Sequence, residues 1–282
     1  MIDATLVTVH GFWSSPRTWD RLTSVWAHDE RLAGLRIHHF GYPSPKAPRL
    51  PFSPTRIPDY EDIAQALANE YSVRLADAGA VVFVTHSQGR LILQRFLVWM
   101  LHEHRGRELA RIASVVTLVC PNNGADYLRS LRRYLGYRRH PQAGELETLN
   151  REVADTQRAV LQDIVNASGI GEYRCRIPVH VYAGIADGVV PAASAQATFP
   201  GAGSIAGNHY SILDPESPGG STAETVRHHL LTDLSAHNRL PPRPPNGRRP
   251  SVTVNNSRNV VVGDHNTIVQ HSGRPDGDED LR

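Results

Sequence analysis

The sequence predicts an α/β protein in which a mainly parallel sheet is covered by helices on both faces. Short apolar runs rich in β-branched residues recur along the chain, as in strands that are buried on both faces. Segments with apolar residues at helical spacing separate these runs. The chain has 282 residues, which is enough for one large core with an appendage. Strands that alternate with helices in this way are typical of parallel sheets.

The predicted strands are apolar runs, several of which stop at a glycine or at polar residues. Residues 4–9 form the first, which ends at the turn His10-Gly11. The following strands are predicted at residues 35–40, 80–85, 113–120, 177–184 and 203–206.

The predicted helices lie between these strands. The first passes through Trp19, Leu22 and Trp26, and others cover residues 59–77, 88–104 and 222–236. In 59–77 the apolar residues recur every fourth position, and in 88–104 they form a mostly apolar stripe. Six prolines between Tyr42 and Pro58 exclude regular structure from that loop.

The segment between the fourth and fifth strands is a polar, helical insertion at residues 125–174, a place suited to a cap over a pocket. Its apolar residues fit either an amphipathic lid that favours lipids or a packed cap.

The folded domain is predicted to span residues 1–238. A proline-rich linker at 239–250, a Val/Asn-rich tail at 251–271 and a disordered terminus at 272–282 follow.

The composition narrows the function classes. The formal net charge is +2 and the basic residues are spread along the chain, so nucleic acid is not an expected partner. No apolar run approaches the roughly 20 residues of a membrane span, and the start lacks a signal-peptide pattern, so a cytoplasmic location is expected. The basic stretch Arg129–Arg139 fits either transient contact with an anionic membrane surface or a solvated helix face. Cys120 and Cys175 are expected to be reduced and buried.

The strongest functional signal is the stretch Val81–Gly89, an apolar strand that runs directly into a helix with Ser87 at the corner. A nucleophile elbow has this context, because the sharp turn exposes the serine hydroxyl. Small residues must flank the serine where the two backbones approach closely. Gly89 meets this requirement, and Thr85 stands where glycine is usual.

Acyl transfer also needs two N–H donors that meet the oxyanion. The elbow supplies the N–H of Gln88, the residue after the serine. The turn after the first strand supplies the second, for which the N–H of Phe12 is the candidate and that of Trp13 the substitute.

These motifs, together with the strand Thr117–Cys120 that leads into Pro121-Asn-Asn-Gly124, resemble the α/β-hydrolase superfamily, with lipase-like serine esterases as the nearest likeness. The resemblance covers roughly residues 4 to 236. It departs from the family pattern at Thr85 and at Asn122, where histidine is usual.

The family's order of serine, acid and histidine completes a site. The loop after Val179–Gly184 resembles the acid-bearing loop and carries Asp187, while Gly207–Ser211 resembles the histidine loop and carries His209. Asp214 is the rival acid. The resemblance implies an esterase that acts on lipid or small-molecule acyl esters through a covalent acyl-enzyme. No metal or cofactor is expected, and His86 is interpreted as scaffold.

Two alternatives and a second hypothesis stay open. The same scaffold serves acyltransferases, and the departures at Thr85 and Asn122 also fit a non-catalytic relic with an assembly role. Asn-rich, β-branched segments such as residues 251–270 can stack in register. The tail loosely resembles amyloid signalling motifs of bacterial effectors, which would make self-assembly or a sensor protein its partner. A floppy or hairpin tail fits equally well.

Overall fold

A computed structural model of the chain describes residues 2–11, 14–44, 60–120, 143–187, 199, 201–217 and 219–239, without the side chains of Tyr60 and of residues 143–150. The predicted linker beyond Arg239, the tail and the terminus lie outside these ranges, as do residues 125–142 of the predicted cap.

The described core is a six-stranded sheet in the order β2-β1-β3-β4-β5-β6, and every neighbouring pair is parallel. The central strands β3 and β4 are buried along their whole length, which explains their continuous apolar sequences. The strands are β1 Ala4–Val9, β2 Arg36–Phe40, β3 Ala80–His86, β4 Ile112–Leu118, β5 Val179–Gly184 and β6 Gly203–Ile205.

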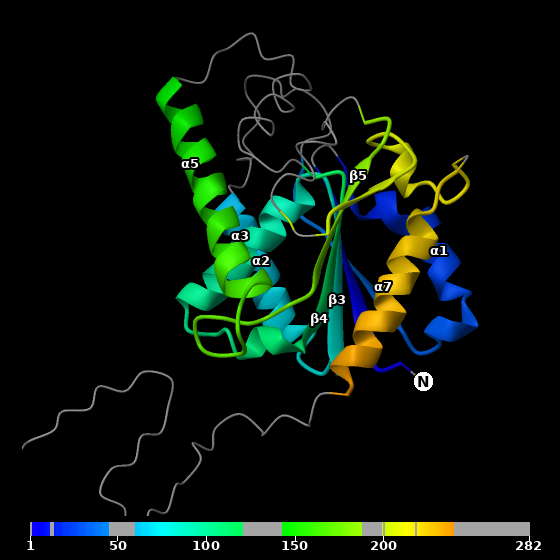
Figure 1. The fold of residues 1–282 in the computed structure, drawn as a ribbon, viewed down its shortest axis with the longest axis horizontal. Helices are drawn as coiled ribbons and strands as arrows, with labels where there is room; N and C mark the ends of the chain where they lie inside the picture. The colour runs from blue at the N-terminus through cyan, green and yellow to red at the C-terminus, as the bar shows by residue number, and fades with distance from the viewer. Residues whose placement is uncertain are drawn as a thin grey trace, which may run out of the picture. The chain divides into compact units, whose positions relative to one another are not determined.

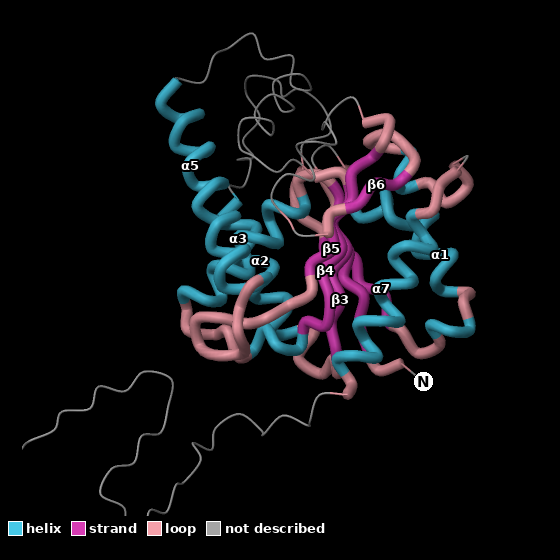
Figure 2. The backbone as a smooth tube through the Cα atoms, in the orientation of Figure 1, coloured by secondary structure: helices cyan, strands magenta, loops and turns pink. Residues whose placement is uncertain are grey.

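Helices cover both faces of this sheet (Figures 1 and 2). Helices α2, α3 and α5 lie on one side, and α1 and α7 on the other. Short 3-10 turns precede α1, β2 and β4, and a fourth, Ser211–Leu213, follows β6. The helices are α1 Asp20–Ala27, α2 Tyr60–Val73, α3 Gly89–His102, α5 Ala143–Val160 and α7 Thr222–His237.

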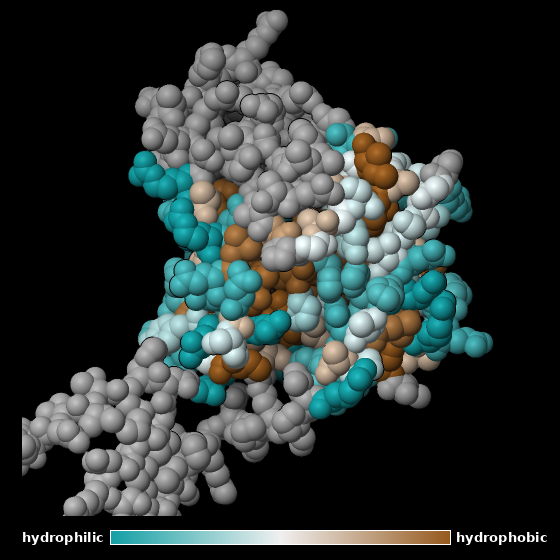
Figure 3. All heavy atoms as spheres, viewed as in Figure 1, coloured by the Kyte–Doolittle hydropathy of each residue, from teal (hydrophilic) through white to brown (hydrophobic). Residues whose placement is uncertain are grey.

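The sheet separates two apolar cores. Because side chains alternate along a strand, Val81 and Phe83 of β3 enter the core shared with α2 and α3, whereas Val82 and Val84 enter the core shared with α1 and α7. In the space-filling view, apolar residues gather at the centre and polar residues lie on the helices to either side (Figure 3). The predicted α/β-hydrolase fold is confirmed.

The second predicted helix ends earlier than expected. The sequence predicts a helix over 59–77, but α2 ends at Val73 and residues 74–77 form turns. There the N–H of Leu75 donates to the carbonyl of Glu70 at 3.2 Å, five residues back. This turn places Leu75 in the core. Leu75 therefore keeps the spacing of the buried helix residues although the helix has already ended.

Helix α5 belongs to the predicted cap and continues into a short π-helix, Leu161–Val165. Val160 and Ile164 are buried in the same core as α3, together with Cys175 and Ile177. The end of the insertion is therefore packed on the domain, whereas its role as a cap remains a prediction. Cys120 and Cys175 are free and buried, as expected.

Candidate active site

Ser87 occupies the corner between β3 and α3 with a φ of 52°. A left-handed backbone costs roughly 1 kcal/mol for a residue with a side chain, so neighbouring contacts must hold it. The Ser87 N–H donates to the carbonyl of Leu118 at the end of β4, at 3.0 Å. The elbow is thus fixed between two central strands.

Two glycines let the backbone approach this corner. A Cβ on Gly89 would lie 2.4 Å from the carbonyl oxygen of Val9, and one on Gly11 would lie 2.9 Å from Cβ of Ser87. Neither position has room for a side chain. The sequence predicted the requirement at Gly89. Thr85, where the family usually has glycine, is fully buried, so the chain accommodates its side chain.

The structure brings the predicted histidine to this serine. Nε2 of His209 lies 3.1 Å from Oγ of Ser87, although 122 residues separate them in sequence. His209 follows β6, in a loop where Gly207 has a φ of 130°. Its side chain is only 9% exposed, so little water reaches the imidazole.

Asp187 lies on the other side of the imidazole. Its Oδ2 is 3.1 Å from Nδ1 of His209, and its side chain is fully buried. The loops that carry the two residues are joined, because the N–H of Ala186 donates to the carbonyl of Gly207 at 3.0 Å. A carboxylate on Nδ1 holds the proton there and leaves the lone pair of Nε2 directed at the serine.

The rival acid lies elsewhere. Asp214 pairs with Arg21 of α1 at 2.9 Å in a solvent-exposed pair, and no hydrogen bond or ion pair joins Asp214 to His209 among the described residues. The imidazole therefore pairs with Asp187.

His86 contributes a contact that the sequence did not reveal. Its Nε2–H donates to the backbone carbonyl of His209 at 2.7 Å. Burial, with a smaller contribution from the neighbouring His209, lowers the pKa of His86 to about 3, so its ring is neutral at pH 7. The predicted scaffold residue is thus linked directly to the histidine loop.

The predicted oxyanion donors are described only in part. Gln88 is buried immediately after Ser87, at the start of α3. Phe12 and its substitute Trp13 lie outside the described residues. His10, which comes shortly before them in sequence, has two contacts with Tyr42. The two rings stack with centroids 4.1 Å apart, and the Tyr42 hydroxyl donates to the carbonyl of His10 at 2.8 Å.

A second group of titratable residues joins the start of β5 to α7. His180, His229 and Asp233 offer ligand atoms within 4.8 Å of one another. This group was not predicted from the sequence, from which no metal was expected. The spacing of His229 and Asp233, four residues apart on a predicted helix, was the available signal.

Comparison with known proteins identifies the class. A sequence model of the alpha/beta hydrolase family matches residues 6–216, and the chain belongs to this family. No curated protein matches the sequence significantly.

Several solved structures are similar in fold. One is the RedJ thioesterase from the prodiginine biosynthetic pathway of Streptomyces coelicolor, at 18% identity over 82% of this chain and 86% of that one, with a TM-score of 0.47. Another is a putative aryl esterase from Burkholderia cenocepacia, at 20% identity over 81% and 91%, with a TM-score of 0.44. At this distance the likeness concerns the fold alone.

None of the described helices is long and apolar enough to cross a membrane.

Proposed function

We propose that this protein is a serine hydrolase that cleaves carboxylic esters, with Ser87 as nucleophile, His209 as general base and Asp187 as the acid that orients the imidazole. One observation carries the proposal: a hydroxyl, an imidazole and a buried carboxylate follow one another at 3.1 Å and 3.1 Å. In a catalytic triad, this series of contacts activates the serine hydroxyl.

The proposed reaction uses these three groups in turn. Oγ of Ser87 attacks the ester carbonyl carbon while Nε2 of His209 accepts the hydroxyl proton. The N–H groups of Gln88 and Phe12 stabilise the negative charge on the carbonyl oxygen. The tetrahedral intermediate expels the alcohol, which takes the proton from His209, and leaves an acyl-serine. Water then attacks the acyl-serine with His209 as base, which releases the acid and restores Ser87.

Asp187 stabilises the imidazolium that forms in each step. Because its carboxylate is fully buried, the attraction between the two charges is screened less than it would be at the surface. His86 helps to position the imidazole through the carbonyl of His209.

Two exposed, large apolar side chains are close in sequence to the proposed triad. Ile185, two residues before Asp187, is 69% exposed, and Tyr210, which follows His209, is 64% exposed. Exposed apolar side chains beside a reactive group can cover an acyl chain or an apolar alcohol. We therefore propose lipid or acyl esters as the substrate class.

Hydrolysis of short-chain and medium-chain aryl esters tests the proposal. We expect Ser87→Ala to lower kcat by about three orders of magnitude or more without a change in fold by circular dichroism. Ser24→Ala is the matched control, because Ser24 is exposed on α1 and its hydroxyl donates to the local carbonyl of Arg21. Equal turnover by Ser87→Ala and wild type would remove the assignment.

An added alcohol acceptor separates hydrolysis from acyl transfer. A hydrolase releases mainly the free acid, whereas an acyltransferase excludes water and yields mainly the new ester. Product analysis by chromatography distinguishes the two.

A further inference from the structure

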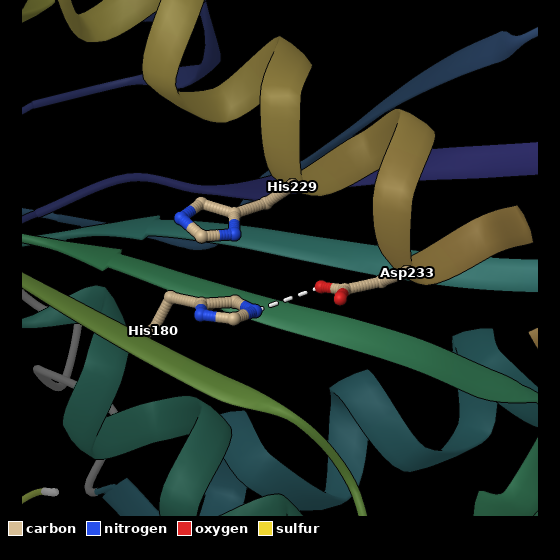
Figure 4. A group of neighbouring side chains, drawn as sticks. All are labelled: His180, His229 and Asp233. Atoms are coloured by element: carbon tan, nitrogen blue, oxygen red, sulfur yellow. Dashed lines mark hydrogen bonds and ion pairs between the residues drawn. The ribbon is translucent and has the colours of Figure 1, made fainter. Parts of the chain in front are cut away.

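The group formed by His180, His229 and Asp233 links β5 to α7, on the face of the sheet that α1 and α7 cover. His180 is the second residue of β5, and His229 and Asp233 lie one turn apart on α7 (Figure 4). Nε2 of His180 is 2.8 Å from Oδ2 of Asp233, and the two imidazole rings stack with centroids 3.6 Å apart.

Two members of the group have a supporting partner outside it. The Ser114 hydroxyl of β4 donates to Oδ2 of Asp233. The Tyr182 hydroxyl lies 2.6 Å from Nε2 of His229, and the other ring nitrogen of His229 faces the side on which Asp233 lies (Figure 4). Metal-ligating histidines in proteins are commonly held in this manner, with the second ring nitrogen bonded to a neighbouring group.

We propose that His180, His229 and Asp233 form a binding site for a divalent transition-metal cation such as Zn²⁺. Two imidazole nitrogens and one carboxylate oxygen are donors that suit Zn²⁺, whereas Ca²⁺ and Mg²⁺ prefer oxygen donors alone. Three protein ligands leave a fourth position for water.

The distances allow the site to close on an ion. A tetrahedral Zn²⁺ with bonds of about 2.0–2.1 Å holds its ligand atoms about 3.3 Å apart. The Nε2–Oδ2 pair, at 2.8 Å, needs to open by about 0.5 Å, and the widest separation, within 4.8 Å, needs to close by up to about 1.5 Å. Because the two rings are stacked, one of them must also turn so that both nitrogen lone pairs point at the ion. When Nε2 of His180 binds the metal, the proton that it shares with Asp233 moves to Nδ1 or to solvent.

The site is independent of the proposed hydrolysis. His180 lies near the start of β5, whereas Asp187 follows the carboxyl end of the same strand. The side chains of His180 and Asp233 are 26% and 12% exposed, so a hydrated ion can reach them. A bound cation would cross-link β5 to α7, and we expect it to stabilise the fold because it binds the folded chain alone.

Zn²⁺ titration of the metal-stripped full chain, with a chromophoric chelator as competitor, tests this site. We expect wild type to bind one Zn²⁺ at least tenfold more tightly than either His229→Gln or His180→Gln does. Co²⁺ in place of Zn²⁺ should give the visible absorption of a four-coordinate ion. Zn²⁺ should raise the Tm of wild type by several degrees and should not raise that of the two variants.

His228→Ala is the matched control, because His228 is the exposed neighbour of His229 on α7. It should bind Zn²⁺ as wild type does. The proposal is overturned if wild type takes up no ion in competition with the chelator, or if either folded glutamine variant binds within twofold of wild type. Because the two variants lie on different elements, one that misfolds leaves the other to decide, and the wild-type titration stands by itself.

Discussion

At the scale of single residues, three contacts hold His209, two on its imidazole and one on its backbone. Asp187 accepts from Nδ1, Ser87 donates to Nε2, and His86 donates to the backbone carbonyl of the same residue. The tautomer and the orientation of the imidazole are fixed, and so is the loop that carries it. The ring therefore loses little further freedom when the reaction begins.

The choice between the two acids is testable at this scale. We expect Asp187→Asn to lower kcat/KM for an aryl ester by about 10⁴-fold, because an amide no longer fixes the tautomer or stabilises the imidazolium. Asp214→Asn should stay within about twofold of wild type, since the exposed pair with Arg21 contributes little. Steady-state kinetics decide. A large loss in Asp214→Asn with retained activity in Asp187→Asn would reverse the assignment.

His86 predicts a pH effect on stability. Its pKa is about 3 in the folded chain, below the ordinary value of 6.5, so the unfolded chain binds a proton that the folded chain excludes. The contribution of neutral His86 to the stability of the folded chain is therefore fully present above pH 6.5 and is lost as the pH falls towards 3. Between pH 7 and pH 5, we expect this residue to account for a loss of about 2 kcal/mol in the free energy of unfolding.

Urea unfolding of wild type and His86→Gln at both pH values measures this loss. Glutamine can still donate to the carbonyl of His209 but does not titrate, so the variant should lose about 2 kcal/mol less than wild type on acidification. His28→Gln, at an exposed position on the surface, serves as the control. Identical losses in wild type and His86→Gln would contradict the link.

At the scale of elements, the site depends on how closely α3 approaches β1. Because a Cβ on Gly89 would meet the carbonyl oxygen of Val9 at 2.4 Å, and a backbone atom within a sheet cannot turn aside, Gly89→Ala should destabilise the fold by about 2 kcal/mol or more. Gly169→Ala is the control, because nothing lies within 4 Å of its added Cβ. Equal denaturation midpoints of the two variants would contradict this close packing.

The elements themselves could largely be predicted from the sequence. All six strands lie where apolar, β-branched runs predicted them, because strands buried on both faces have few other sequence solutions. The end of α2 could not be predicted, since Leu75 keeps the helical spacing while it is buried by a turn. The spacing of apolar residues indicates which residues are buried. It does not determine whether a helix or a turn places them in the core.

At the scale of the whole molecule, parallel order brings distant residues to one edge of the sheet. Ser87, Asp187 and His209 each follow the carboxyl end of a different strand, so the fold gathers them although the sequence separates them. The sequence predicted these three residues because each stands in a recognisable motif directly after a predicted strand. The contact of His86 with His209, and the approach of His180 to α7, depend on side-chain packing between elements, which spacing along one element does not reveal.

The central claim is that Ser87 is an activated nucleophile. The most direct measurement is the reaction of the full chain with a fluorophosphonate probe, followed by mass spectrometry of the labelled peptide. We expect one label per chain, on Ser87, with labelling abolished in Ser87→Ala and strongly slowed in His209→Ala. An intact, folded chain that takes up no label, or that carries it on another serine, would contradict the account.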